Sequence, residues 1–241
     1  MSNYEHIIRR TFNRFGLDLH RYRPEQSGVG RLHHMLSAHA INVVFDVGAN
    51  VGQFAKALRQ AGYLHKIVSF EPLPAAHAEL LRESQHDREW MIAPRAAIGD
   101  HDGEITIHVA GNSVSSSVLG MLESHVAAAP SSAYVNDETV PLHTLDSQVS
   151  TYLSGSDVSF LKIDTQGYEQ YVLDGAPLLL DVVKGVQLEL SLVPLYEGQR
   201  LFHSFLDDFK DRGFSIWSIE PGFSDPKRGR MLQVDVTFFR D

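Results

Sequence analysis

The chain has 241 residues, a formal net charge of −9 and no cysteine. This length predicts one large α/β domain with its own core, and the missing thiols exclude disulfides, thiolate nucleophiles and cysteine-ligated metal sites. The acidic balance argues against a general nucleic-acid binder, which would present a basic face. No apolar run approaches the roughly 20 residues of a membrane span, and the N-terminus carries no secretory signal, so we expect a soluble, cytoplasmic protein.

The N-terminal residues predict an amphipathic helix that ends at Gly16, and a second helical stretch follows at residues 32–39. We expect residues 1–41 to form a helical lid or extension before a main domain of residues 42–241. We favour packing of the first helix over the domain or against a second copy in a homo-oligomer. The alternative left open is that its basic face lies on an anionic membrane surface. Its apolar stripe and its arginines are Tyr4, Ile7, Ile8, Thr11, Phe12 and Phe15, and Arg9, Arg10 and Arg14.

From residue 43 onwards, buried strands alternate with helices, which predicts a parallel sheet covered on both faces. Two closing strands with no convincing helix between them indicate that the last strand is antiparallel. The expected strands are 43–47, 67–70, 158–163, 186–190, 214–219 and 232–239, and the expected helices are 52–61, 74–84, 170–173 and 201–212.

The middle of the chain does not follow this alternation of strands and helices. Residues 104–109 alternate polar and apolar like a half-exposed strand or hairpin. Residues 110–139 are rich in Ser, Ala and Asn and show no clear period. We expect them to form a long loop on the acceptor side of the site, because loops of this length in a compact domain are usually functional lids or partly disordered.

The strand at 43–47 runs into the loop Asp46-Val47-Gly48-Ala49-Asn50-Val51-Gly52. Gly48 permits a tight turn with close backbone approach to a ligand, and Gly52 lets the following helix pack near the strand. The N–H groups at the helix start favour an anionic group such as a carboxylate. The next strand ends in Glu71, which is placed to hold two ribose hydroxyls. Together these features predict a nucleoside site.

The residue type at position 50, an asparagine, indicates which nucleoside to expect. The dinucleotide fingerprint needs a glycine at this point, so that the backbone can approach a pyrophosphate. S-adenosylmethionine has no pyrophosphate but offers an amino-acid end, which the polar Asn50 and the acidic Asp46 suit better. We therefore predict S-adenosylmethionine as the cofactor and disfavour a nicotinamide-dependent dehydrogenase.

Several segments resemble the FkbM-type methyltransferases. The most specific contains Lys162-Ile163-Asp164, then Gly167 and Glu169, and matches that family's Lys-Ile-Asp-x-x-Gly-x-Glu pattern. Gln166 stands where the family often has Glu, so we assign it no acid–base role. The resemblance covers roughly residues 43 to 240, and its other segments are 45–52, 70–72, 97–100, 187–191, 222–223 and 232–235.

The resemblance implies a Rossmann-like class I methyltransferase sheet of about seven strands, mostly parallel with an antiparallel last strand and with helices on both faces. It also implies O-methylation of sugars, polyketides or related metabolites. By analogy, the cofactor contacts from the methionine end through the ribose to the adenine are Asp46, Gly48, Asn50 and Gly52, then Glu71, then Ala97 and Ile98.

A sugar hydroxyl is a poor nucleophile, so a base or a metal that takes up its proton would help in-line methyl transfer. Asp164 ends a strand and faces the expected cleft, and it is the first candidate base; its alternative role is to cap a helix or pair with Lys162. Glu189, at the end of the next strand, is the second candidate. Asp164 and Glu189 could together hold Mg²⁺ through oxygen ligands, but we predict no metal site.

His143 lies just before a turn at a plausible edge of the cleft and is the third candidate base, with a surface or packing histidine as the alternative. Asn112 and the serines that follow it could hydrogen-bond a polyhydroxylated acceptor or belong to a flexible polar loop. No Gly-x-Ser-x-Gly elbow is present, which argues against nucleophilic serine chemistry.

The leading hypothesis is an O-methyltransferase acting on a small-molecule or glycan acceptor, such as a sugar or a sugar-bearing or polyketide natural product. An N- or C-methyltransferase stays open, because the cofactor motifs are shared. A non-catalytic nucleoside-binding protein is disfavoured, because the strand ends keep carboxylates beyond those that the cofactor needs.

Overall fold

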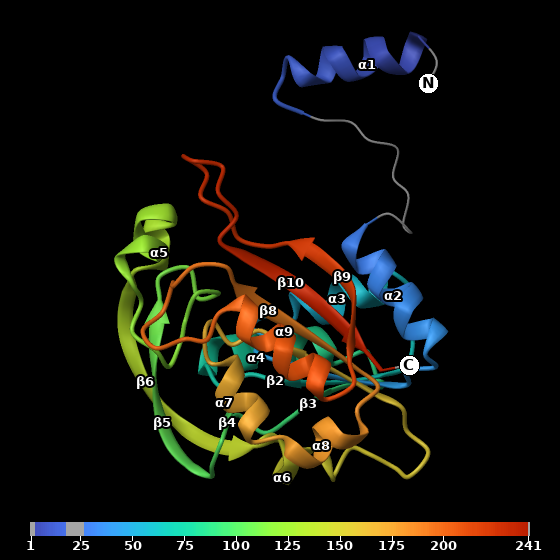
Figure 1. The fold of residues 1–241 in the computed structure, drawn as a ribbon, viewed down its shortest axis with the longest axis vertical. Coiled ribbons are helices and arrows are strands. Elements are labelled where there is room, and N and C mark those ends of the chain that lie inside the picture. The colour runs from blue at the N-terminus through green and yellow to red at the C-terminus, as the bar shows by residue number, and fades with distance from the viewer. Residues whose placement is uncertain (1–2, 18–26, 241) are drawn as a thin grey trace.

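The computed structural model describes residues 3–17 and 27–240 of the chain. Figure 1 shows a central sheet flanked by helices, a smaller sheet beside it, and an N-terminal helix that stands apart. Within the described residues, no helix is long and apolar enough to cross a membrane.

Seven strands form the central sheet in the order β3-β2-β1-β7-β8-β10-β9. Neighbours are parallel from β3 to β8, and β10 is antiparallel to both β8 and β9. This confirms the predicted sheet of about seven mostly parallel strands with an antiparallel last strand. The strands are β1 (Val43–Val47), β2 (Lys66–Phe70), β3 (Trp90–Ile92), β7 (Ser159–Ile163), β8 (Gly185–Ser191), β9 (Ser215–Pro221) and β10 (Gln233–Phe239).

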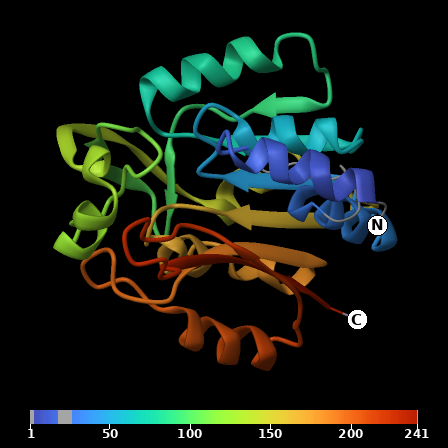
Figure 2. The same ribbon diagram turned by 90° about the horizontal axis from the view of Figure 1, so that it is seen from above.

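The central strands are apolar on both faces because helices cover both. In β1, Val44 belongs to one buried cluster, whereas Phe45 and Val47 belong to another, as the two-residue period of a strand requires. Figure 2 shows α4 and α9 on opposite sides of the sheet. One face carries α2 (Gly28–Ala38), α3 (Gln53–Gln60) and α4 (Pro74–Ser84), and the other carries α6 (Leu145–Val149), α7 (Glu169–Asp174), α8 (Pro177–Val182) and α9 (Phe202–Asp211).

A second sheet of three strands lies beside the central one, in the order β4-β6-β5. It consists of β4 (Ala97–Gly99), β5 (Gly103–Ala110) and β6 (Tyr134–Thr144). β5 is the half-exposed strand that the alternation at residues 104–109 predicted, and it pairs antiparallel with β6.

The expectation of one long irregular loop at residues 110–139 is wrong. This stretch contains α5 (Glu123–Ala128), the 3₁₀ helix η2 (Pro130–Ser132) and the first half of β6. That half of β6 is mostly exposed, and its side chains are mostly polar and show no hydrophobic period. Backbone pairing with β5 holds it in place instead.

The predicted N-terminal extension contains two helices in different surroundings. Leu32, Met35 and Leu36 of α2 are buried in the same cluster as Val44 of β1, so α2 packs on the central sheet. The other helix, α1 (Asn3–Asn13), has exposed apolar side chains and stands apart from the sheets in Figure 1.

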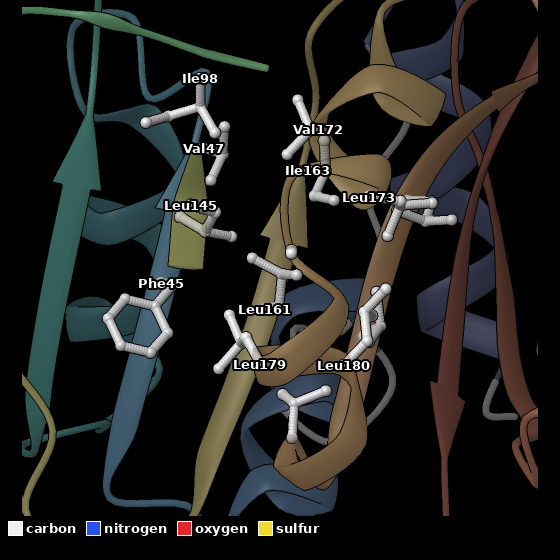
Figure 3. Close-up of a cluster of buried hydrophobic side chains, with 14 of the residues drawn as sticks. Phe45, Val47, Ile98, Leu145, Leu161, Ile163, Val172, Leu173, Leu179 and Leu180 are labelled. Atoms are coloured by element: carbon white, nitrogen blue, oxygen red, sulfur yellow. The ribbon is translucent and has the colours of Figure 1, made fainter. Parts of the chain in front are cut away.

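The buried cluster between β7 and the helices of one face stabilises the fold, so removing side-chain volume from it should lower the free energy of unfolding. Figure 3 shows Leu161 of β7 in the middle of the buried cluster. We predict that Leu161→Ala lowers the free energy of unfolding by about 3 kcal/mol, because buried Leu→Ala changes cost about 2–5 kcal/mol. Urea denaturation measures this loss.

Leu178→Ala is the matched control, because Leu178 of α8 is 72% exposed. It is expected to change the free energy of unfolding by no more than about 0.5 kcal/mol. Equal losses from the two substitutions would contradict the assignment of Leu161 to the core.

Candidate active site

A pocket of about 350 Å³ lies at the carboxyl ends of β1, β2 and β7. Open α/β sheets bind ligands at this edge, and the volume is within the range of small-molecule sites. Its wall is built by the ends of these strands, by the start of β4 and by the segment that follows β5. The predicted site residues that line it are Gly48, Asn50, Glu71, Ala97, Ile98 and Asp164.

The turn after β1 depends on residues with positive φ. Gly48 has a φ of +77°, and a Cβ at this position would lie 1.9 Å from the backbone oxygen of Asp164. Asn50 also has a positive φ, of 48°, which asparagine adopts more readily than most residues. Gly52 does not line the pocket; a Cβ there would lie 2.6 Å from the ring of Trp90, so Gly52 allows α3 to pack closely.

Glu71 joins the loop after β2 to the loop after β1. One carboxylate oxygen accepts the N–H of Asn50 and the other accepts the N–H of Leu73, each at 2.8 Å. Burial raises the pKa of Glu71 to about 7, although both hydrogen bonds oppose this shift. A carboxylate offers about four lone-pair sites, so this fixed group can still accept hydrogen bonds from a ligand's hydroxyls.

The N–H groups of the glycine loop are largely used within the protein. Gly48 and Ala49 donate to the carbonyl of Phe70, and Val51 donates to the side-chain oxygen of Asn50. The loop is therefore held in shape before any ligand arrives. A ligand's anionic group would have to use donors beyond these, such as the first N–H groups of α3 or the side chain of Lys162.

Asp46 lies beneath the pocket and does not line it. Its carboxylate is fully buried, 3.1 Å from Nζ of Lys162, which itself lines the pocket and also lies 3.5 Å from Asp164. Burial alone would lower the pKa of Lys162, but Asp46 and Asp164 outweigh it and raise that pKa. Lys162 therefore stays protonated, and Asp46 contacts the lysine rather than the pocket.

Asp164 and Glu189 are brought together, but through a third residue. The amide nitrogen of Gln166 donates to Asp164 at 2.9 Å and to Glu189 at 2.5 Å, while its oxygen accepts the hydroxyl of Tyr196 at 2.7 Å. Gln233 donates to Glu189 at 2.8 Å as well. Glu189 does not line the pocket, and burial together with the charge of Asp164 raises its pKa well above the ordinary value.

The amide of Gln166 thus occupies the place between the two carboxylates where a shared cation would lie. Among residues 3–17 and 27–240, no group of three or more His, Asp or Glu side chains is arranged to hold a metal ion.

His143 is not brought to the pocket. Its side chain is 39% exposed and its Nδ1 lies 3.4 Å from a carboxylate oxygen of Asp102. It sits on β6 next to Ile98, yet only Ile98 lines the cavity.

The structure adds a residue that sequence reasoning did not place in the site. Asp235 on β10 lines the pocket opposite Glu189 on β8, and burial raises its pKa to about 6. A signal was present, because polar side chains alternate with apolar ones along β10 and so mark one face of that strand. Ser113, Ser116 and Ser117, which the sequence offered as possible contacts to an acceptor, line the pocket as well.

These serines are held by the protein itself. Ser116 donates to the carbonyl of Ser113 at 2.7 Å, and Ser117 donates to the carbonyl of Gln166 at 2.7 Å. The side-chain nitrogen of Asn112 donates to the hydroxyl of Ser115, and its side-chain oxygen accepts the N–H of Ser115. The segment is therefore a shaped wall, ordered by its own polar side chains.

Glu169 holds the loop that carries Gln166. Its Oε1 accepts the N–H groups of Thr165 and Gly167 at 3.0 and 3.1 Å. Gln166 and Gly167 both have positive φ, so the loop turns sharply at this point. Burial raises the pKa of Glu169 to about 7 despite these bonds. At pH values between the ordinary pKa of a glutamate, 4.5, and the raised pKa of Glu169, about 7, the folded state binds more protons than the unfolded state.

It follows that the contribution of Glu169 to stability is present at low pH and is lost as the pH rises through this window. We predict that Glu169→Gln, which keeps the acceptor oxygen, flattens the pH dependence of the unfolding free energy by up to about 1.4 kcal/mol per pH unit. Urea denaturation across pH 4.5 to 7 measures it. Glu104→Gln, at an exposed position of β5, should leave the dependence unchanged; an unchanged slope in Glu169→Gln would refute the prediction.

Solved structures with a similar overall arrangement include several methyltransferases. Magnesium protoporphyrin IX methyltransferase from Synechocystis, with bound S-adenosylmethionine, has a TM-score of 0.48 at 14% identity, with 100% of this chain and 99% of that chain covered. An rRNA methylase from Streptococcus thermophilus has a TM-score of 0.47 at 9% identity, with 92% and 99% covered. A putative RNA methyltransferase from Pyrococcus horikoshii has a TM-score of 0.46 at 14% identity, with 92% and 88% covered.

No curated protein matches the sequence. The family model of the methyltransferase FkbM domain matches residues 46–216, which is more than half of the 241 residues. This region includes the turn after β1, the Glu71 loop and the Asp164–Glu169 segment that build most of the pocket. The chain therefore belongs to the FkbM family of S-adenosylmethionine-dependent methyltransferases.

Proposed function

We propose that the pocket holds S-adenosylmethionine with its methionine end at Gly48 and Asn50, its ribose at Glu71 and its adenine at Ala97 and Ile98. The fit is supported by the close backbone approach at Gly48 and by the fixed, buried carboxylate of Glu71. Asp46 would act through Lys162, and Gly52 through the packing of α3, rather than by touching the cofactor.

We further propose that the enzyme methylates a hydroxyl of a sugar or of a sugar-bearing or polyketide natural product. The observation that carries this is the carboxylate of Asp164, which lines the pocket, is 34% exposed, and is held by Gln166 and Lys162. The remaining wall combines polar groups, such as Ser113 and Asp235, with apolar ones such as Val114. Such a mixed wall suits an acceptor that has both hydroxyls and an apolar part.

The bound cofactor supplies a methyl group activated on a sulfonium. Asp164 would accept the proton of the acceptor hydroxyl while that oxygen bonds to the methyl carbon and the carbon–sulfur bond breaks. Gln166 fixes the direction of the Asp164 carboxylate, and Lys162 holds its second oxygen. The pocket walls orient the acceptor and exclude water, which supplies a further part of the rate.

The same geometry would serve an amine or an activated carbon, because a carboxylate can take a proton from either. Mass spectrometry and NMR of the methylated product decide between oxygen, nitrogen and carbon. Methylation at nitrogen or carbon would overturn the hydroxyl assignment and leave the cofactor site intact.

The cofactor site is tested by calorimetric titration of S-adenosylmethionine and S-adenosylhomocysteine into the purified chain and into Glu71→Ala. We expect binding to weaken at least about 100-fold in the variant, because each hydrogen bond to a charged group contributes about 1.5–3 kcal/mol. Glu104→Ala, outside the pocket, serves as the control, and thermal melts confirm that each variant is folded. Unchanged binding by a folded Glu71→Ala variant would contradict the assignment of Glu71 to the ribose.

The base is tested with Asp164→Asn, which keeps the size of the side chain. We predict that kcat of methyl transfer to a hydroxylated acceptor falls by about 10²- to 10⁴-fold, as is typical for loss of a general base. Binding of S-adenosylhomocysteine should stay nearly unchanged. His143→Ala, which alters a side chain outside the pocket, should keep the wild-type rate; a loss there and not at Asp164 would reverse the assignment.

A further inference from the structure

Helix α1 and the turn that follows it carry apolar side chains that are exposed in the part of the chain that the structure describes. Ile7, Ile8, Phe12 and Phe15 are 63%, 51%, 39% and 78% exposed. Their spacing places Ile7, Ile8 and Phe12 along one side of α1, since each residue turns the helix by about 100°, and Phe15 follows in the turn after the helix. In Figure 1, α1 stands clear of both sheets.

An 11-residue helix of this kind is not stable by itself in water. Isolated helices shorter than about 12–15 residues are marginal even with good helix-forming sequences, and most helical stability comes from burial of the apolar face. The α1 helix therefore needs a partner that covers this face.

The charges on α1 point to the chemistry of that partner. Arg9 and Arg10 of α1, and Arg14 in the turn directly after it, fall outside the apolar stripe, in a chain whose net charge is −9. A helix with an aromatic and aliphatic face and an arginine-bearing polar face is suited to the interface of a lipid bilayer, where the apolar face enters the acyl region and the arginines reach anionic headgroups.

A second basic element lies elsewhere in the chain. The β9–β10 hairpin tip, residues 222–232, carries Lys227, Arg228 and Arg230, all exposed. The Asp225 carboxylate shapes this tip by accepting the N–H groups of Lys227 and Arg228. The backbone N–H of Asp225 donates to the carbonyl of Arg230, and its carbonyl accepts the N–H of Gly229.

The hairpin tip is at the pocket end of the central sheet. β9 and β8 both pair antiparallel with β10, so they run in the same direction, and the carboxyl end of β9 lies at the edge where the pocket opens. Asp235, two residues into β10, lines the pocket. Figure 1 shows the hairpin tip pointing toward the end of the molecule where α1 lies.

We propose that α1 and the β9–β10 hairpin tip form a docking surface for an anionic lipid bilayer, with α1 in the plane of the interface and the pocket end of the sheet turned toward the lipid. Each Lys or Arg near such a surface contributes about 1 kcal/mol, so neither element alone holds the acidic body as firmly as the two together. This surface is independent of the methyl acceptor and holds whether or not the proposed chemistry is correct.

The experiment is co-sedimentation of the full chain with phosphatidylcholine vesicles that contain or lack phosphatidylserine. The expected result is binding to the phosphatidylserine vesicles alone, with an affinity that falls as salt rises. Reversal of all three charges by Arg9→Glu, Arg10→Glu and Arg14→Glu should weaken this binding more than about 100-fold, and Phe15→Asp should weaken it as well. Reversal at Lys227, Arg228 and Arg230 should also weaken it.

The matched control reverses three exposed charges away from this surface, at Arg88, Lys210 and Arg212. It should bind the vesicles as the wild type does. Calorimetric titration with S-adenosylhomocysteine confirms that all variants keep their folded pocket, which separates a failure of docking from a failure of the proposed cofactor site.

Three outcomes would overturn the proposal. One is a wild-type chain that binds neither kind of vesicle, or both equally. Another is vesicle binding that survives charge reversal on α1 or on the hairpin tip. The third is sedimentation of the free chain as a dimer that Phe15→Asp dissociates, because a second copy would then cover the apolar face of α1.

Discussion

The buried charge of Lys162 is the constraint on which the candidate site depends. Lys162 of β7 lies directly beside Asp46 of β1 in the parallel register, so the ion pair joins the two central strands of the sheet. A buried charge is tolerated only when it is paired, and removing one partner typically costs about 3–5 kcal/mol. The same ammonium lies 3.5 Å from Asp164, so one buried cation both ties the strands together and fixes a carboxylate of the pocket.

The electrostatics of the pocket follow from this arrangement. Asp164, Asp235 and Glu71 line it, whereas Lys162 is already engaged by two carboxylates. Such a wall favours a ligand that brings its own positive charge, as a sulfonium does. Gln166 limits the local excess of negative charge, because its neutral amide donates to Asp164 and Glu189 where a glutamate would add a third carboxylate.

The strands and helices of the central sheet could be predicted because their patterns are local. Residues 43–47 and 74–84 were predicted with the bounds that the structure has, since the fully buried β1 is a continuous apolar run and α4 begins with a proline. The failure at residues 110–139 has the opposite cause. The outer half of β6 is exposed, and only its pairing with β5 makes it a strand, so no hydrophobic period marks it.

The sheet, the glycine turn after β1 and the positions of Glu71 and Asp164 at strand ends could all be predicted from the sequence, because apolar period and turn chemistry are properties of short segments. Which of the carboxylates reach the pocket depends on how these segments pack together. This packing places Asp46 beneath the floor against Lys162, Glu189 behind Gln166, and His143 outside the wall. This is because the direction and solvation of a side chain at a strand end depend on partners from other segments of the chain, such as Lys162 for Asp46 and Gln166 for Glu189, and no local pattern records them.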